Sequence, residues 1–344
     1  MELLSGTVLT RDGFIDGYVV IDGGVIVEVS EGRCPGTPVA EGLITAAPVN
    51  SHSHCADGGL KVPPGMSLEE LVAPPDGLKH RYLDSVPDFE LGQSMRRFSE
   101  LSLNGGYGAF IDFREGGERG CRILRESVPD AVILGRPTSK KYDPDEAESI
   151  LEASDGIGLP SISDIDACYA ESIADDVRRA RKMLGIHVSE RVREDIDAVL
   201  SLDPAFVVHM VESADRDLLK CAEAEVPVVV CARSNAFFGS VPPIKRMIDA
   251  GVDVAIGTDN AMLCEPDVRK EASAFLKVLT AQGGDPEAVW RPMLEAGRNI
   301  LYPAKDIHIR KGAEADVTVF PYSGSMSVRS VLESTDRILR LRRR

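Results

Sequence analysis

Two histidines separated by one residue follow the first strongly apolar stretch of the sequence. His52 and His54 come after the run 43–48, which is typical of a buried strand. Residues i and i+2 of a strand point to the same side, so both imidazoles are directed at one point. Imidazole nitrogen is a common ligand of zinc and other divalent metals. The spacing therefore predicts a metal site, although such a pair also occurs in strands that bind no metal.

Three further side chains that can bind a metal ion end later apolar runs. His187, His209 and Asp259 each end such a run, and Glu190 follows His187 at the start of a predicted helix. Taken singly, Glu190 could compensate the charge of a helix N-terminus, and Asp259 could cap a turn. Their recurrence at the ends of successive runs favours one shared site over separate structural roles.

The centre of the sequence alternates β-branched runs with helical patterns, which predicts parallel strands connected by helices. The strand candidates are residues 43–48, 107–113, 131–136, 156–162, 184–188, 205–209, 227–231 and 252–257. Helical patterns between them include residues 88–101, 166–183, 191–200, 215–224 and 244–250. This order predicts an α/β fold, a (β/α)8 TIM-like barrel, in which the carboxyl ends of the strands carry the site.

Both ends of the chain predict a separate β unit. Short β-branched runs joined by turn residues occupy residues 6–30, and a similar run lies at 312–320. We expect these runs to pair into a small β-sandwich domain built from both termini. The predicted division is 1–41 with 310–325 for the β domain, 42–309 for the barrel and 326–344 for a helical tail.

One long segment interrupts the alternation directly after His54. Residues 55–80 are rich in glycine and proline, and we interpret them as a structureless lid that crosses the barrel mouth. A passive surface loop is the alternative.

Composition limits the classes of partner that the chain can have. Its 344 residues are 43% hydrophobic, which is enough for a full-sized core, and its net charge of -16 disfavours nucleic acid. No apolar run reaches the length of a membrane span, and no signal peptide is recognisable, so we expect a cytoplasmic protein that contacts no membrane. The 7 cysteines lack the spacing of disulfides, which agrees with that compartment. The sequence leaves open whether the chain forms a homo-oligomer.

The combined motifs resemble those of the amidohydrolase superfamily of metal-dependent hydrolases. The resemblance runs over nearly the whole chain and rests on His52-Ser-His54, His187, His209 and Gly257-Thr-Asp259. It implies a barrel that carries one or two divalent metals at its mouth.

Two further motifs resemble the one-metal members that deaminate cytosine, guanine or S-adenosylhomocysteine. They are the pair His187-x-x-Glu190 and the segment 231–235, in which Ala232 replaces a proline. Two-metal members bridge their ions with a lysine at the fourth strand, but the candidate 156–162 contains no lysine. Lys140 and Lys141, which follow the third strand candidate, are not expected to fill that role.

The resemblance implies a role for each motif residue. One Zn²⁺ or Fe²⁺ would be held by His52, His54, His187 and Asp259. His209 would orient the attacking water or the substrate, Glu190 would shuttle protons, and Asp259 would take the second proton. The implied activity is release of ammonia from the amino-bearing carbon of a small heterocyclic substrate, such as a purine, pyrimidine, pterin or nucleoside derivative, by metal-activated water.

Substrate contacts and the bond that is broken are less defined. Arg114 and Arg136 follow the second and third strand candidates, and either could bind a carboxylate or phosphate or form an ion pair at the rim. Asn235 could hydrogen-bond the edge of a base. Hydrolysis of a cyclic amide, as in imidazolonepropionase-like members, would use a similar residue set. A non-catalytic metal-binding scaffold would leave Glu190 and His209 without a task, and the Pro-Cys-x-x-Cys signature of cytidine-deaminase zinc sites is absent.

Overall fold

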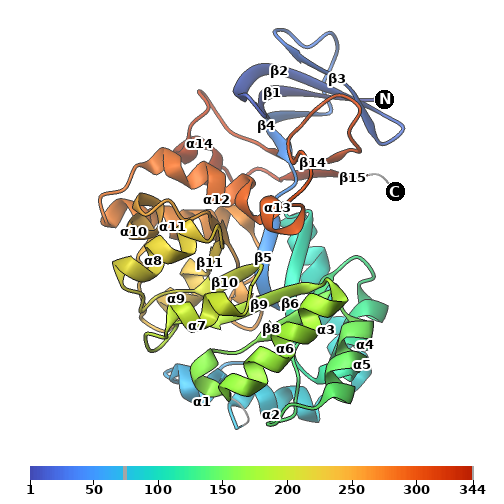
Figure 1. The fold of residues 1–344 in the computed structure, drawn as a ribbon. Coiled ribbons are helices and arrows are strands. Elements are labelled where there is room, and N and C mark those ends of the chain that lie inside the picture. Colours follow the sequence, from blue (N-terminus) through green and yellow to red (C-terminus); the bar gives the residue numbers. More distant parts are fainter. Residues whose placement is uncertain (73–75, 343–344) are drawn as a thin grey trace.

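The computed structural model describes residues 1–72 and 76–342, which form two sheets and the helices around them (Figure 1). The larger sheet has nine strands in the order β12-β11-β10-β9-β8-β7-β6-β5-β13, and all neighbours pair in parallel. Its strands are β5 (Val49–His54), β6 (Ala109–Arg114), β7 (Val132–Gly135), β8 (Gly156–Leu159), β9 (Met183–Val188), β10 (Phe206–His209), β11 (Val228–Val230), β12 (Val254–Ile256) and β13 (Asp259–Asn260). Parallel strands with helices between them make the fold α/β, as predicted.

The two ends of this strand order are joined by one short segment. β12 pairs with β11, whereas β13, which begins three residues later in the chain, pairs with β5. Between them, Gly257 N donates to Val230 O at 3.0 Å and Thr258 N donates to His52 O at 3.0 Å. Residues 254–260 therefore bring the carboxyl end of the last strand directly beside His52 and His54.

Helices connect the strands, and several begin at a side chain that caps them. Asp143 and Asp166 each accept hydrogen bonds from two backbone N–H groups, which the first turn of a helix otherwise leaves unpaired. The helices from α3 onward are α3 (Asp88–Asn104), α4 (Gly117–Ser127), α5 (Pro144–Ala153), α6 (Ala167–Ala180), α7 (Ile196–Ser201), α8 (Asp215–Glu223), α9 (Ala232–Phe237), α10 (Ile244–Asp249), α11 (Val268–Ala281), α12 (Trp290–Leu294), α13 (Ala296–Leu301) and α14 (Val328–Leu332). Short 3-10 helices lie at η2 (Ile162–Asp164) and η3 (Pro286–Val289). No helix in the described ranges combines the length and the apolar character needed to cross a membrane.

The smaller sheet is built from both ends of the chain, in the order β15-β14-β4-β1-β2-β3. Its strands are β1 (Glu2–Thr10), β2 (Gly13–Asp22), β3 (Val25–Glu31), β4 (Ala40–Ala46), β14 (Asp316–Phe320) and β15 (Leu339–Arg342). A bridge between Val25 and Glu314 brings the far edge of β3 back toward β14, around an apolar core that includes Leu4, Val19 and Val317. The pairing of the two termini follows the prediction, and a true sandwich of two sheets stays a prediction.

Two boundaries of the predicted division are wrong. The run 43–48 was expected to be the first barrel strand, but β4 pairs with β1 and β14, and β5 fills that place. The apolar character continues across both strands, so it hides the passage from one sheet to the other. The tail predicted as a helix contains α14 but ends in β15, where Leu339 and Leu341 alternate with two arginines, a strand period. Residues 343–344 lie outside the described residues.

The segment predicted to be structureless contains three short helices. They are η1 (Cys55–Gly59), α1 (Leu68–Val72) and α2 (Leu78–Ser85), and residues 73–75 lie outside the described residues. Both α1 and α2 lie at the end of the molecule opposite the smaller sheet (Figure 1). Below, the described part of residues 55–85 is called the cover segment.

Candidate metal centre

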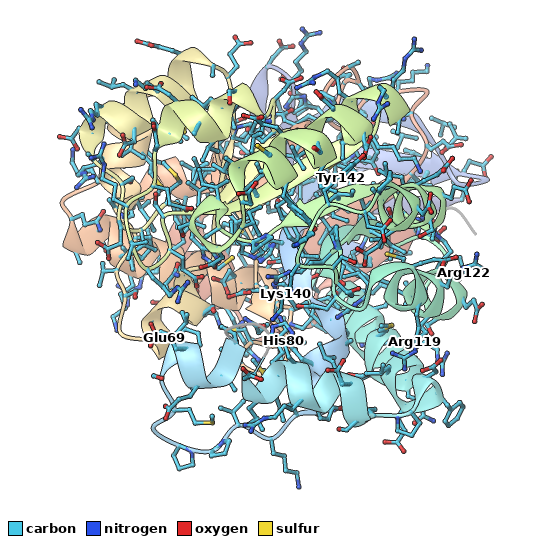
Figure 2. All side chains as sticks on the ribbon, turned by 60° about the horizontal axis from the view of Figure 1, so that its bottom comes forward. Glu69, His80, Arg119, Arg122, Lys140 and Tyr142 are labelled. Carbon is cyan, nitrogen blue, oxygen red and sulfur yellow. The ribbon has the colours of Figure 1, made fainter. Side chains whose placement is uncertain are left out.

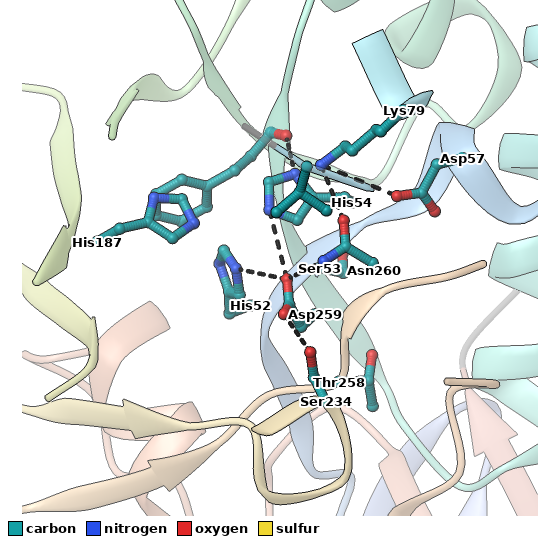
Figure 3. Close-up of polar contacts among 12 residues, drawn as sticks. His52, Ser53, His54, Asp57, Lys79, His187, Ser234, Thr258, Asp259 and Asn260 are labelled. Atoms are coloured by element: carbon teal, nitrogen blue, oxygen red, sulfur yellow. Dashed lines mark hydrogen bonds and ion pairs between the residues drawn. The ribbon is translucent and has the colours of Figure 1, made fainter. Parts of the chain in front are cut away.

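Four histidines and one aspartate converge at the carboxyl ends of the parallel strands. Nitrogen atoms of His52, His54 and His187 lie within 4.8 Å of one another, and so do potential ligand atoms of His52, His209 and Asp259. Asp259 Oδ1 lies 3.4 Å from His52 Nε2 and 3.5 Å from His54 Nε2 (Figure 3). The sequence prediction that these five residues meet at one point is therefore supported by the geometry.

The backbone turns sharply where two of these side chains leave their strands. His209 has φ 77° and Asp259 has φ 60°, in the left-handed region that non-glycine residues rarely adopt. Ser189, two residues after His187, has φ 49°. Residues held in such conformations cost about 1–3 kcal/mol each and concentrate at functional sites. The strained backbone at these positions lowers the stability of the fold, and it directs the side chains toward the site.

Backbone carbonyls determine which nitrogen of two histidines is free. His54 Nδ1 lies 3.0 Å from Phe113 O, and His187 Nδ1 lies 2.8 Å from Leu159 O. A carbonyl oxygen only accepts, so Nδ1 carries the hydrogen in both rings and Nε2 keeps its lone pair. This arrangement of a donated Nδ1–H and a free Nε2 is typical of histidines that bind metals.

His52 lies at the centre of the group, and its surroundings keep it neutral. Its side chain is fully buried, and neither ring nitrogen has a hydrogen bond to any described residue. Burial lowers the pKa of His52 to about 3, and burial together with the neighbouring histidines lowers the pKa of His187 well below its ordinary value. The neutral, buried imidazole of His52 fits a metal ion, because a buried ring nitrogen without any partner costs free energy.

Asp259 is held as an anion in the same group. Burial alone would raise its pKa, but the nearby side chains of His52, His209 and His54 hold the pKa of Asp259 well below its ordinary value. Ser234 Oγ donates to Asp259 Oδ2 at 2.5 Å, and Asn260 Nδ2 donates to Oδ1 at 2.9 Å. A fixed carboxylate beside neutral imidazoles completes a donor set suited to a divalent cation.

Glu190 lies at the edge of this group, in different electrostatic surroundings. It lies in the loop after β9, because α7 begins only at Ile196, five residues later than the predicted start at residue 191. Its Oε1 lies 3.6 Å from His209 Nε2, and the side chain is 18% exposed. Burial raises the pKa of Glu190 despite the opposing effect of His209. A carboxyl group with a raised pKa beside a cavity is suited to carrying protons.

A small cavity of about 60 Å³ opens between these residues and the cover segment. Leu68 and Val72 of α1 and Lys79 of α2 line it from one side, opposite His187 and Glu190. From below, Figure 2 shows α1 and α2 across the front of the molecule, with Glu69 and His80 labelled on them. The prediction that the cover segment lies over the mouth therefore agrees with the structure, whereas its role as a lid stays a proposal.

The residues predicted to bind substrate are placed differently from one another. Arg136 lines the cavity, and Arg114 does not: it is buried, and it pairs with Asp112 at 3.1 Å and with Glu115. Asn235 is buried in α9 and is not among the lining residues, so contact with substrate in this cavity is not supported for it. Lys140 is exposed, as expected for a lysine that bridges no metals (Figure 2).

Sequence reasoning missed a group of polar residues behind the metal ligands. Glu115 Oε1 lies 2.7 Å from His54 Nδ1, and Lys79 Nζ lies 2.5 Å from the same oxygen. Asn260 connects Lys79 to Asp259. Glu115 directly follows β6 and Asn260 is the last residue of β13, which is a signal that could have found them. Lys79 carries no such signal, because nothing local shows that its helix folds back onto the site.

Known proteins resemble this chain in sequence and in fold. No family model matches the chain. A protein of Methanothermobacter thermautotrophicus that is provisionally named an aminohydrolase is 35% identical over 287 residues, covering 76% of this chain and 75% of that protein. A 5-methylthioadenosine/S-adenosylhomocysteine deaminase of Thermococcus onnurineus is 29% identical over 56% of this chain and 52% of its own length. The crystal structure of an atrazine chlorohydrolase from Arthrobacter aurescens, complexed with zinc, has the same fold, with a TM-score of 0.74 at 16% identity over 98% of this chain and 88% of its own.

The extent of these similarities establishes the class of the protein. The chain belongs to the amidohydrolase superfamily, together with relatives named as aminohydrolases and deaminases. It is a hydrolase that acts on carbon–nitrogen bonds other than peptide bonds.

Proposed function

We propose that this protein is a metal-dependent deaminase that releases ammonia from an amino-substituted heterocycle. The observation that carries the proposal is the grouping of His52 with His54, His187 and Asp259, the last three of which line a cavity that Glu190 also lines. Deaminase names among the relatives support the reaction class. We further propose that the nine strands form a (β/α)8 barrel, in which 254–260 is the eighth strand and closes the sheet onto β5, beside a small sandwich made from the termini.

The four ligands of the proposal leave a bound ion with net positive charge. His52, His54 and His187 are neutral and Asp259 carries one negative charge, so a Zn²⁺ or Fe²⁺ ion would retain a charge of about +1 there. When bound, such an ion lowers the pKa of a coordinated water from 15.7 to about 7. The protein supplies the orientation of the ligands and a cavity from which bulk water is largely excluded.

The protein's own carboxylates move the protons of the reaction. Glu190 accepts the first proton of the attacking water and delivers it to the ring nitrogen next to the reacting carbon. Asp259 accepts the second proton and passes it to the amino group. The carbon–nitrogen bond then breaks, ammonia leaves and a ring carbonyl remains. His209, 3.6 Å from Glu190, orients the reacting groups. Proton delivery is needed because neither nitrogen leaves readily as an anion.

Arg136 is the side chain that we propose to contact the remote part of the substrate. It lines the metal-site cavity and also a neighbouring cavity of about 240 Å³. Among the described residues its guanidinium has no hydrogen bond and no ion pair. A free guanidinium group can bind a carboxylate or phosphate through two parallel hydrogen bonds, in a bidentate arrangement. Arg136→Met should raise KM for anionic substrates and leave KM for neutral ones nearly unchanged, and equal effects on both would remove this role.

The size of the cavity implies that the cover segment moves. Pockets for small molecules usually measure roughly 300–1,000 Å³, and the space beside the histidines is about 60 Å³. A heterocycle cannot enter unless Leu68 and Val72 of α1 withdraw. We therefore propose that α1 acts as a lid, which would open for substrate and close to exclude water during the reaction.

An ammonia assay tests the proposed function directly. The purified protein, loaded with Zn²⁺ or Fe²⁺, is mixed with aminopurines, aminopyrimidines, pterins, thio-nucleosides and cyclic amides. Ammonia from a heterocycle, abolished by a chelator, is the expected result. Ring opening without ammonia would replace the proposal by cyclic amide hydrolysis, since the same residues serve both. If a protein shown to contain its metal neither releases ammonia nor opens a ring in any of these compounds, both deamination and cyclic amide hydrolysis would be overturned.

A further inference from the structure

Lys79 is a buried cation that belongs to the cover segment but ends among residues of the metal centre. Its side chain is 4% exposed. Its Nζ lies 2.5 Å from Glu115 Oε1, 2.9 Å from Asn260 Oδ1 and 3.8 Å from Asp57 Oδ2. The ammonium group donates a hydrogen bond to Asn260 of β13, and it forms ion pairs with Glu115, which follows β6, and with Asp57 of η1. Figure 3 shows Lys79 reaching toward Asn260 and Asp57 behind His54.

We propose that Lys79 is a positioning residue that fixes two of the proposed metal ligands at once, Asp259 through Asn260 and His54 through Glu115. The inference rests on the proposed function, because it gives these two side chains the role of ligands. It adds a residue of the cover segment to the machinery of the site.

The first connection depends on the orientation of an amide. Lys79 has no acceptor, so the atom of Asn260 that faces it must be the oxygen. The amide nitrogen of Asn260 then faces Asp259 Oδ1, to which it donates at 2.9 Å. Without Lys79 the amide could rotate and direct its oxygen at a carboxylate, which would repel it. Lys79 therefore determines that Asp259 receives a donor on the oxygen that faces the histidines.

The second connection passes through a carboxylate. Glu115 Oε1 is shared between Lys79 Nζ and His54 Nδ1, and Oε2 pairs with Arg114. Arg114 would keep Glu115 charged if Lys79 were removed, but one oxygen would lose the contact that holds it against His54. Such partners set the ring orientation of a ligating histidine, and their loss typically costs 10–100-fold in metal affinity or activity.

The position of Lys79 in the chain gives this network a further consequence. Lys79 is the second residue of α2, close in sequence to α1, which covers the cavity. Lys79 can therefore contribute to the position of both ligands only while α2 is docked, in addition to the contacts of Phe113 O with His54 and of Ser234 with Asp259. Docking of the cover segment would then complete the ordering of the proposed metal centre.

Substitution of Lys79 tests the proposal through metal binding and turnover. Lys79→Met is compared with wild type and with Lys61→Met, a control at an exposed lysine of the same segment. Each apo protein is loaded with Co²⁺, whose visible absorption reports ligand geometry, and Zn²⁺ affinity is measured by competition with a chromogenic chelator. For Lys79→Met we expect an altered Co²⁺ spectrum and a 10–100-fold loss of affinity or of kcat. An unchanged spectrum with unchanged affinity and kcat would overturn the proposal.

Two further comparisons keep the test decisive. Removal of a buried cation could prevent folding, so Asn260→Ala, which breaks only the connection to Asp259, is measured in parallel. It should alter the Co²⁺ spectrum as well, and a wild-type spectrum in that variant would overturn the first connection. Failure of the proposed function appears separately, as a wild-type protein that binds metal but releases no ammonia.

Discussion

Two glutamates at the mouth of the parallel sheet have opposite surroundings. Glu115, after β6, is in contact with Lys79, Arg114 and His54. Burial would raise its pKa, but Lys79, His54 and Arg114 beside it hold the pKa of Glu115 well below its ordinary value. Glu190, after β9, lies 3.6 Å from His209, and burial raises its pKa.

This difference teaches which carboxylate can move a proton. A group whose anion is compensated on every side gains nothing by accepting a proton, so Glu115 is suited to holding His54 in place. A group whose anion is poorly compensated holds a proton more readily, and Glu190, whose pKa burial raises, also lines the cavity. Pairs of acids whose surroundings separate their pKa values mark the assignment of roles in many enzymes.

The comparison between Glu115 and Glu190 depends on a metal ion being bound at the site. Removal of a proposed metal ligand is therefore the test with the largest expected effect. His187→Ala and Asp259→Ala should each remove the ion and reduce turnover to background, because each deletes one of four proposed ligands. Metal content by elemental analysis, with ammonia release on the same sample, measures both. His308→Ala is the control, since His308 pairs with Glu295 and Asp306 away from the site. Stoichiometric metal in both site variants would show that the ligands are assigned wrongly.

The next test exchanges the two glutamates for their amides. Glu190→Gln should keep the metal and lower kcat by roughly 10²–10⁴-fold, the usual contribution of general acid–base catalysis. Glu115→Gln should instead weaken metal binding or activity by about 10–100-fold, because its contribution is orientation. Metal titrations and kcat on both variants separate the two effects.

The opposite pattern would reverse the assignment of roles. If Glu190→Gln turned over normally while Glu115→Gln retained its metal and lost kcat, Glu115 would be the proton carrier. The raised pKa of Glu190 would then be a consequence of burial alone.

Much of the fold could be predicted because its signals are local. Apolar runs separated by helical patterns predicted the parallel strands β6 to β12, with bounds that agree with the structure to within a few residues. The failures occurred where local signals are ambiguous. The apolar character of β4 continues into β5, so no break marks the change of sheet. The basic tail looked like a helix end, although its alternation of leucine and arginine matches β15.

The grouping of the proposed metal ligands could be predicted from sequence, whereas the residues behind them could not. His52, His54, His187 and Asp259 close strands, and parallel strands place such residues at one edge by rule. Lys79 reaches the same edge through the path of the cover segment, which no local period encodes. Arg114 has the position expected of a substrate contact, but three neighbouring carboxylates in one buried patch make it an ion-pair partner instead.

A third buried glutamate sharpens the distinction between a raised pKa and a catalytic role. Glu271 of α11 is fully buried, accepts a hydrogen bond from Arg233 N and is not among the residues lining the metal-site cavity. Burial raises its pKa from 4.5 to about 7. The folded chain therefore binds a proton between these values that the unfolded chain releases, so stability should fall as pH rises from about 5 to 8. The loss attributable to Glu271 is about 3 kcal/mol at most.

Glu271→Gln should remove that pH dependence and leave kcat within a few-fold of wild type. Urea unfolding at pH 5.5, 7 and 8.5 measures the difference between variant and wild type, which should favour the variant increasingly toward alkaline pH. A difference that is constant across this range would mean that Glu271 is ionised throughout, and that burial alone does not raise the pKa of a carboxyl group in this region.

The smallest expected effect concerns the cover segment at its outer edge. Glu69 of α1 lies 3.6 Å from Arg191, which directly follows Glu190, and the two side chains are 73% and 33% exposed. Exposed pairs of this kind contribute at most about 1 kcal/mol, so Glu69→Gln should change kcat/KM less than about fivefold. Arg191 should stay in place, because Asp164 also contacts it, at 3.0 Å.

Salt distinguishes this weak contact from the buried contact of Lys79. The difference between Glu69→Gln and wild type should vanish at high ionic strength, where exposed charges are screened. Steady-state kinetics at low and high salt make the comparison. A change of tenfold or more that persists at high salt would mean that α1 itself positions Glu190 through Arg191. The contrast between Glu115, which is fixed by its partners, and Glu190, which is not, would then be wrong. Both glutamates would depend on the cover segment for their position.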